Sequence, residues 1–311
     1  MTTEPGRSGP SRKEPETGAP SARFPKVEGD GWSGNLKRRA LSGVPALLLV
    51  LIVVGFAPTF VIALIVLVVA TLATIEFHRL LPERIRAALG VQPMVVGAIM
   101  LGVGAWVLGS AGLNLMLFAA AIVMTAMIWL GPAGSSDEGV PLAGTALLGL
   151  ILVPWMLNHL SLIHGLPGGG GYVAMLVTIV TLNDTLAYLV GSLLGSRPLV
   201  PRISPNKTVE GAIAGLGGGV AGGLIGYFWL LPFESGPGFF EALLMGAVLA
   251  AFAQAGDLLE SKLKRLVGAD ESGSFLPGHG GLLDRLDAYL LSAPLLYYYV
   301  YLQLGIGAPG A

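Results

Sequence analysis

The residues best suited to chemistry lie in a charged block near the C-terminal end, between two strongly apolar runs. A helix over residues 254–266 would place side chains at i, i+3, i+4, i+7 and i+8 on a single face. The side chains on this face are Asp257, Glu260, Ser261, Lys264 and Arg265. Two further carboxylates, Asp284 and Asp287, lie three residues apart on the next expected helix, and they also share a face.

Carboxylates from these two helices are suited to hold a hard cation. Mg²⁺ is typically held by one or two carboxylates together with substrate phosphates, and Asp257 and Asp284 form such a pair, with Asp287 beside them. The glycine-rich segment before Asp284 allows close backbone approach, and His279 within it is expected to form a hydrogen bond to substrate. The alternative is that the carboxylates only balance cations at a membrane surface. We expect a magnesium site at Asp257, Asp284 and Asp287.

A second polar set lies upstream. Asp184 lies inside an apolar run, where an unpaired carboxylate is costly, so it must face water, a cation or a hydrogen-bonding group on another helix. Ser204 and Pro205 are predicted to be the N-cap and first residue of the following helix. Lys207 and Thr208 would then lie in its opening turn, and a helix N-terminus with a lysine is suited to bind phosphate.

The elements that must position these residues are membrane helices. Hydrophobic residues make up 53% of the 311 residues, and Ala40 to Ile75 carries no charge, which is enough for two spans of roughly 20 residues. Nine apolar segments are expected to span the membrane, at about 41–57, 59–76, 92–109, 112–131, 141–162, 172–193, 208–231, 239–256 and 284–304. The glycine-rich seventh segment is expected to pack closely against its neighbours. We predict an all-α, polytopic integral membrane protein with about nine transmembrane helices.

The basic residues give the orientation. With nine spans and a cytoplasmic N-terminus, all 18 Lys and Arg residues lie on the cytoplasmic side, as the positive-inside rule requires. Loops 194–207 and 257–283 then face the same compartment, where they can form one site. The chain has no Cys, which excludes disulfides, thiol chemistry and Cys-based metal sites.

Three regions follow from this pattern. Residues 1–36 are rich in Pro, Gly, Ser and charged residues and are predicted to form a disordered cytoplasmic tail. Residues 37–135 form the N-terminal transmembrane helices, and residues 136–311 form a transmembrane catalytic region. The basic cluster Lys37–Arg39 precedes an apolar run that is too long for a signal-peptide core, so we expect an uncleaved first span rather than a signal peptide.

Together, the two polar sets resemble the signature of the phosphatidate cytidylyltransferase (CDP-diacylglycerol synthase) family. That signature comprises Asp-x-x-Ala-Tyr, then Ser-Pro-x-Lys-Thr-x-Glu-Gly, then a closing block that ends in Pro-Gly-His-Gly-Gly-x-x-Asp-Arg-x-Asp. The chain has all three in order, at Asp184–Tyr188, Ser204–Gly211 and Gly256–Asp287. One departure is Asp270-Glu271, where the family usually has Lys-Asp, which removes a positive charge.

The resemblance implies an enzyme of phospholipid biosynthesis. The phosphate of phosphatidate attacks the α-phosphorus of CTP, which releases pyrophosphate and forms CDP-diacylglycerol at the cytoplasmic membrane interface. The expected catalytic residues are Asp257, Asp284, Lys207, Lys264 and Arg265. The expected substrate-binding residues are Asp184, Ser204, Lys207, Thr208, Ser261, His279 and Arg285.

The resemblance also implies cofactors and partners. We expect Mg²⁺, a second, monovalent cation, a homodimer, and a multi-pass location in the cytoplasmic membrane, without nucleic acid as a partner. Two other functions stay open. A related enzyme could transfer CMP to a different lipid phosphate, and an ion-coupled transporter could use Asp184 as its coupling carboxylate. The polar residues cluster at one interface, and no paired broken helices appear in matching halves of the chain, which disfavours the transporter.

Overall fold

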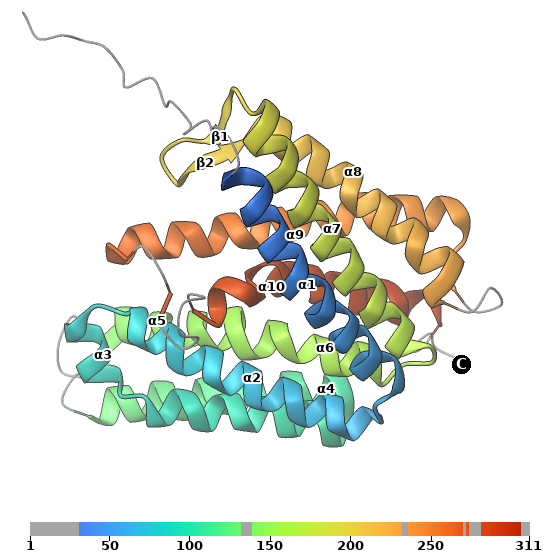
Figure 1. The fold of residues 1–311 in the computed structure, drawn as a ribbon. Helices are drawn as coiled ribbons and strands as arrows, with labels where there is room; N and C mark the ends of the chain where they lie inside the picture. Colours follow the sequence, from blue (N-terminus) through green and yellow to red (C-terminus); the bar gives the residue numbers. More distant parts are fainter. Residues whose placement is uncertain (1–30, 132–138, 232–235, 270–271, 274–280, 306–311) are drawn as a thin grey trace, which may run out of the picture.

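The computed structural model describes residues 31–131, 139–231, 236–269, 272–273 and 281–305 (Figure 1). The helices are α1 (Gly31–Phe56), α2 (Thr59–Leu80), α3 (Glu83–Leu89), α4 (Gln92–Leu130), α5 (Gly139–Leu150), η2 (Ile151–Trp155), α6 (Met156–His164), α7 (Gly169–Leu194), α8 (Val209–Ile225), η3 (Gly226–Leu230), α9 (Phe239–Val267) and α10 (Leu283–Gln303). Strands β1 (Pro198–Val200) and β2 (Ser204–Thr208) form an antiparallel hairpin between α7 and α8. The all-α prediction is confirmed, with this short hairpin as the exception.

Six helical segments of the described chain are long and apolar enough to cross a membrane. They are Thr59–Leu80, Gln92–Leu130, Gly139–His164, Gly169–Leu194, Val209–Leu230 and Phe239–Val267. The prediction of a polytopic membrane protein is confirmed, while the count of nine spans and the cytoplasmic N-terminus stay predictions. Most of the predicted tail lies outside the described residues, but helix α1 already begins at Gly31, inside the segment expected to be disordered.

Helix α4 is a pair of antiparallel helices rather than one rod. A straight helix of 39 residues would be about 58 Å long, roughly twice the hydrocarbon thickness of a bilayer. The chain reverses at Gly109, whose φ of 63° and ψ of −146° are not helical. Gly104 and Gly112 then face each other so closely that a Cβ on Gly104 would lie 2.6 Å from the Gly112 carbonyl oxygen. The two halves correspond to the separate spans predicted at 92–109 and 112–131.

The C-terminal helices form successive layers, with α8 between α7 and α9, and α10 between α9 and α6 (Figure 1). Glycines on two faces of α8 allow this close approach. A Cβ on Gly222 would lie 2.7 Å from the Cα of Ile179 in α7, and one on Gly223 would lie 3.1 Å from the Cα of Gly246 in α9. The expected close packing of the glycine-rich segment is therefore present in the structure.

Helix α8 begins later than the sequence predicted. Ser204 and Pro205 belong to strand β2, and the N-cap is Thr208, whose Oγ1 accepts a hydrogen bond of 3.1 Å from the Gly211 amide. Both Ser and Thr are good N-caps, so the sequence alone does not choose between them. Pairing of Ser204 with Val200 across the hairpin keeps the chain extended up to Thr208. Lys207 consequently lies just before α8 rather than inside its first turn.

Helix α9 continues beyond the predicted apolar span and carries the charged block as far as Val267. The helix predicted over 254–266 is therefore present. Helix α10 begins at Leu283, so Asp284 and Asp287 lie in its first two turns. The structure thus presents the two carboxylate sets on adjacent helices.

We expect a bulky residue to separate α8 from α9. The Gly219→Val variant should lose about 1–3 kcal/mol of stability through overpacking, because a Cβ at this position would collide with Ala250 and the Gly246 carbonyl. Gly217→Val is the matched control, because nothing lies within 4 Å of a Cβ there. Thermal unfolding in detergent measures the difference, and equal melting temperatures for the two variants would contradict the packing described.

Candidate functional site

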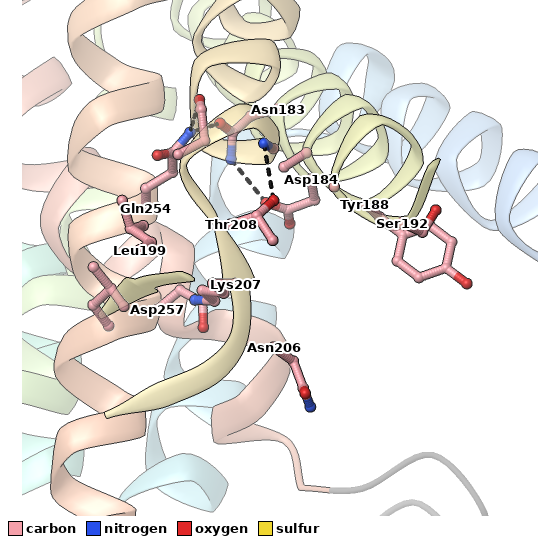
Figure 2. Close-up of a pocket in the computed structure, with 15 residues that line it drawn as sticks. Asn183, Asp184, Tyr188, Ser192, Leu199, Asn206, Lys207, Thr208, Gln254 and Asp257 are labelled. Atoms are coloured by element: carbon pink, nitrogen blue, oxygen red, sulfur yellow. Dashed lines mark hydrogen bonds and ion pairs between the residues drawn. The ribbon is translucent and has the colours of Figure 1, made fainter. Parts of the chain in front are cut away.

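A cavity of about 480 Å³ lies between α7, the β1–β2 hairpin and α9 (Figure 2). Polar side chains from three separate segments line it. They are Asn183, Asp184, Tyr188 and Ser192 from α7, Asn206, Lys207 and Thr208 from β2, and Gln254 and Asp257 from α9. The two polar sets identified in the sequence therefore meet at one cavity.

An ion pair joins the two sets directly, because Lys207 Nζ contacts Asp257 Oδ2 (Figure 2). The Lys207 side chain is 29% exposed and the Asp257 side chain 35%. Partly solvated ion pairs contribute little to stability, about 0–1 kcal/mol. Either member can thus exchange its partner for a charged ligand at small cost.

Two amide side chains that line the cavity form a hydrogen-bond network. Asn183 donates to Asp184 Oδ1 at 2.8 Å, and Gln254 donates to Asn183 Oδ1 at 2.7 Å and to the Ala212 carbonyl at 3.0 Å. This network links α7, α8 and α9 and orients Asp184, which is exposed to the cavity. We did not predict Gln254 from the sequence. Its signal was the presence of an amide inside an otherwise apolar run, two residues before Gly256.

Asp257 lies near Asp287, at the contact between α9 and α10. Helices α9 and α10 approach so closely that a Cβ on Gly256 would contact the Asp287 carbonyl. Asp287 is buried, and the Asp257 carboxylate lies close enough to act on it electrostatically. Two carboxylates this close are unfavourable unless a proton or a cation lies between them.

Lys264 occupies the next turn of the same interface. Its Nζ lies 2.6 Å from Glu260 Oε2 and 2.6 Å from Asp284 Oδ1. Asp284 Oδ2 also accepts hydrogen bonds from the amides of Ser272, at 3.2 Å, and Gly281, at 3.0 Å. Glu260 is only 1% exposed, so Lys264 neutralises a buried carboxylate and ties α9 to α10.

The donor set has the chemistry that a hard cation requires. Within the part of the chain that the structure describes, no three Asp, Glu or His side chains converge as metal ligands. The facing carboxyls of Asp257 and Asp287 nevertheless present oxygen ligands that match Mg²⁺, which takes its remaining ligands from water and phosphate. The magnesium site at Asp257, Asp284 and Asp287 stays a prediction.

The other predicted residues have varied positions. Thr208 lines the cavity and caps α8, and Arg265 donates to the Ile203 carbonyl of the hairpin at 3.4 Å. Ser204 lies in β2, Ser261 is partly buried in α9, and Arg285 is exposed on α10. His279 and Asp270-Glu271 lie outside the described residues. None of the predicted binding roles of these residues is tested by their positions.

Glu210 anchors the hairpin that carries Lys207. Its carboxylate accepts hydrogen bonds from Ser196 Oγ at 2.7 Å and Ser196 N at 3.1 Å, and from Arg197 Nε at 3.2 Å. Glu210 belongs to the first turn of α8, so these bonds fix the segment that leads into β1 against that helix. The glutamate three residues after Lys207 in the motif therefore has a structural role, because it holds the segment before the hairpin against α8.

Comparisons with known proteins agree with the motif resemblance. A model described as the cytidylyltransferase family matches residues 37–303. A phosphatidate cytidylyltransferase of Bacillus subtilis is 30% identical over 85% of this chain and 97% of that protein. A phosphatidate cytidylyltransferase of Brucella abortus is 40% identical over 53% of this chain, and the matched region spans 58% of that protein. A third relative, the uncharacterized protein YnbB of Escherichia coli, is 36% identical over 49% of this chain.

We expect Lys264→Met to be strongly destabilising, by about 3–5 kcal/mol, because it leaves the buried Glu260 carboxylate without its cation. Adding Glu260→Gln should restore part of that loss. Lys262→Met is the matched control, since Lys262 is exposed on the same helix. Thermal unfolding of the purified variants in detergent checks this, and a Lys264→Met protein as stable as the control would refute the structural role.

Proposed function

The chain belongs to the cytidylyltransferase family, and we propose that it transfers CMP from CTP to phosphatidate, forming CDP-diacylglycerol and pyrophosphate. The observation that carries this proposal is the convergence of Lys207, Asp257 and Asp184 at one cavity. Helices α7, α8 and α9 line this cavity, and each belongs to a segment long and apolar enough to cross a membrane, which suits an enzyme whose substrate is a lipid.

Lys207 and the start of α8 are the proposed phosphate-binding elements. Lys207 precedes the N-terminus of α8 directly, and helix N-termini favour anions. The triphosphate of CTP would take Lys207 from Asp257, an exchange that their partial exposure makes inexpensive. Arg265 and Arg285 would add positive potential along α9 and α10, and Lys264, which is paired with Glu260 and Asp284, would add less.

The nucleophile needs no strong general base. A phosphate monoester has a second pKa near ~6, so the phosphatidate oxygen is largely deprotonated at neutral pH. That oxygen forms a bond to the α-phosphorus while the bond from the α-phosphorus to the bridging oxygen breaks, and pyrophosphate leaves with the electron pair. The protein's contribution is therefore positioning and charge stabilisation.

The carboxylates of Asp257, Asp284 and Asp287 are proposed to hold Mg²⁺. Asp284 lies one turn before Asp287 on α10 and is paired with Lys264. When bound, the ion offsets the negative charge of the triphosphate. Asp184, oriented by Asn183, lines the same cavity and would contact water or substrate hydroxyls. A second, monovalent cation and a homodimer rest on the family resemblance alone.

The cavity is proposed to open at the cytoplasmic face of the cell membrane, where CTP is present. Tyr188 and Ser192 lie on the side of the cavity away from Asp257 (Figure 2). Leu193 and Leu194 follow on α7 and are 60% and 70% exposed, which suits contact with acyl chains. The lipid tails could thus stay in the bilayer while the head group reaches Lys207.

The direct test is an assay of purified protein with labelled CTP and several lipid phosphates, with and without a chelator. We expect Mg²⁺-dependent labelling of phosphatidate, and Lys207→Ala should lower turnover about 100-fold because it removes a preorganised charge. Lys207→Arg should restore only part of the rate, since a planar fork replaces a compact ammonium. Arg202→Ala, at an exposed position of the hairpin turn, is the control. Normal turnover by Lys207→Ala would show that Lys207 only anchors the hairpin.

The carboxylates should act as one unit. Asp257→Asn and Asp284→Asn should each nearly abolish turnover, and the double variant should be scarcely worse than either, as for residues that act together. Glu83→Gln is the control, because Glu83 is an exposed carboxylate on α3. Steady-state turnover, measured for variants with equal membrane abundance, shows whether the two losses add. Modest losses that add in the double variant would instead indicate simple charge balance.

A further inference from the structure

A carboxylate from the N-terminal half of the chain holds the start of α10. Glu76, near the end of α2, is 4% exposed. Its Oε2 accepts a hydrogen bond of 2.8 Å from the Leu283 amide, and its Oε1 accepts one of 3.3 Å from Ser272 Oγ. Leu283 is the first residue of α10, so Glu76 supplies from another helix the anionic cap that a helix N-terminus favours.

The partners of Glu76 also hold Asp284. The Ser272 amide donates to Asp284 Oδ2 at 3.2 Å, and the Asp284 amide donates to Ser272 Oγ at 3.3 Å. Ser272 therefore bonds to Glu76 and Asp284 at once. The remaining oxygen of Asp284 contacts Lys264, so a continuous set of hydrogen bonds and an ion pair runs from α2 to α9.

The Glu76 carboxylate occupies space that side chains at two neighbouring positions, Gly273 and Gly281, would otherwise fill. A Cβ on Gly273 or on Gly281 would collide with Glu76 Oε1, and one on Gly281 would also collide with Ser272 Oγ. Neither glycine has an unusual φ. Their lack of a side chain is therefore required by the buried carboxylate and not by backbone conformation.

We propose that Glu76 is a positioning residue for Asp284. A buried carboxylate is costly unless donors satisfy it, and the donors here are the α10 N-terminus and the serine that binds Asp284. Glu76 sets the place of the first turn of α10 and with it the direction of the Asp284 carboxylate. The effect of this positioning on catalysis rests on the proposed function, whereas the positioning itself does not.

The first test needs no substrate. Hydrogen exchange of the purified full chain in detergent should show at least 10-fold faster exchange at Leu283 and Asp284 in Glu76→Gln than in wild type. Exchange within α7 should stay unchanged. Glu83→Gln, an exposed carboxylate on α3, should leave all of these rates as in wild type. Unchanged exchange at the α10 N-terminus in Glu76→Gln would overturn the proposal.

A second pair of variants tests the same contact by changing Gly281, which packs against Glu76, and not Glu76 itself. Gly281→Ala should reproduce the exchange pattern of Glu76→Gln, because the added methyl group displaces Glu76 and Ser272. Gly217→Ala is its control, since nothing lies within 4 Å of a Cβ there. If the amides of Leu283 and Asp284 exchange as slowly in Gly281→Ala as in the control, the contact with Glu76 does not position this helix.

Kinetics separate positioning from general instability. If Glu76 acts through Asp284, Glu76→Gln should raise the Mg²⁺ concentration for half-maximal turnover about 10-fold, and excess Mg²⁺ should recover part of the rate. A purely structural loss would lower the amount of active enzyme and leave that concentration unchanged, which would count against the proposal. If wild-type protein shows no CTP-dependent activity, the proposed function fails, while the exchange experiment still decides the role of Glu76.

Discussion

The cost of charge inside an apolar helical bundle governs this structure. Glu260 is 1% exposed and Glu76 is 4% exposed, and buried carboxylates persist only where cations or N–H donors satisfy them. Lys264 forms an ion pair with Glu260, and the α10 N-terminus and Ser272 donate hydrogen bonds to Glu76. The Lys264–Glu260 pair lies within α9, whereas Lys264 also contacts Asp284 in α10, and Glu76 in α2 accepts from the α10 N-terminus. These two contacts between helices fix α2, α9 and α10 against one another.

Small residues make this arrangement geometrically feasible. Gly256 lets α9 approach α10 closely enough to set Asp257 opposite Asp287. On the other side of the cavity, Gly211 lies against Gly191, where a Cβ on Gly211 would be 3.1 Å from the Gly191 Cα. Close approach of α7 and α8 there brings Thr208 and Asp184 to one cavity. Packing and electrostatics are therefore two aspects of the same requirement.

Local patterns were predictable from the sequence, whereas partners across the fold were not. Apolar runs and the spacing of Asp257, Glu260 and Lys264 predicted the helices and a shared face, because both depend on residues within a few turns. The start of α8 was predicted wrongly at Ser204, because Thr208 is an equally good cap and strand pairing decides between them. The contacts of Asp284 with Lys264 and of Glu76 with Leu283 depend on how helices cross, which no spacing along the chain encodes.

The ion pairs fall into two classes with different consequences for binding. Lys264 and its carboxylates are mostly buried, so separating them is strongly unfavourable, by about 3–5 kcal/mol. Lys207 and Asp257 are each about a third exposed, and such a pair contributes about 0–1 kcal/mol. A polyphosphate entering the cavity can therefore displace Asp257 from Lys207 without loosening the α9–α10 interface. The freed Asp257 carboxylate then lies beside Asp287, where a cation that accompanies the phosphate would meet two oxygen donors.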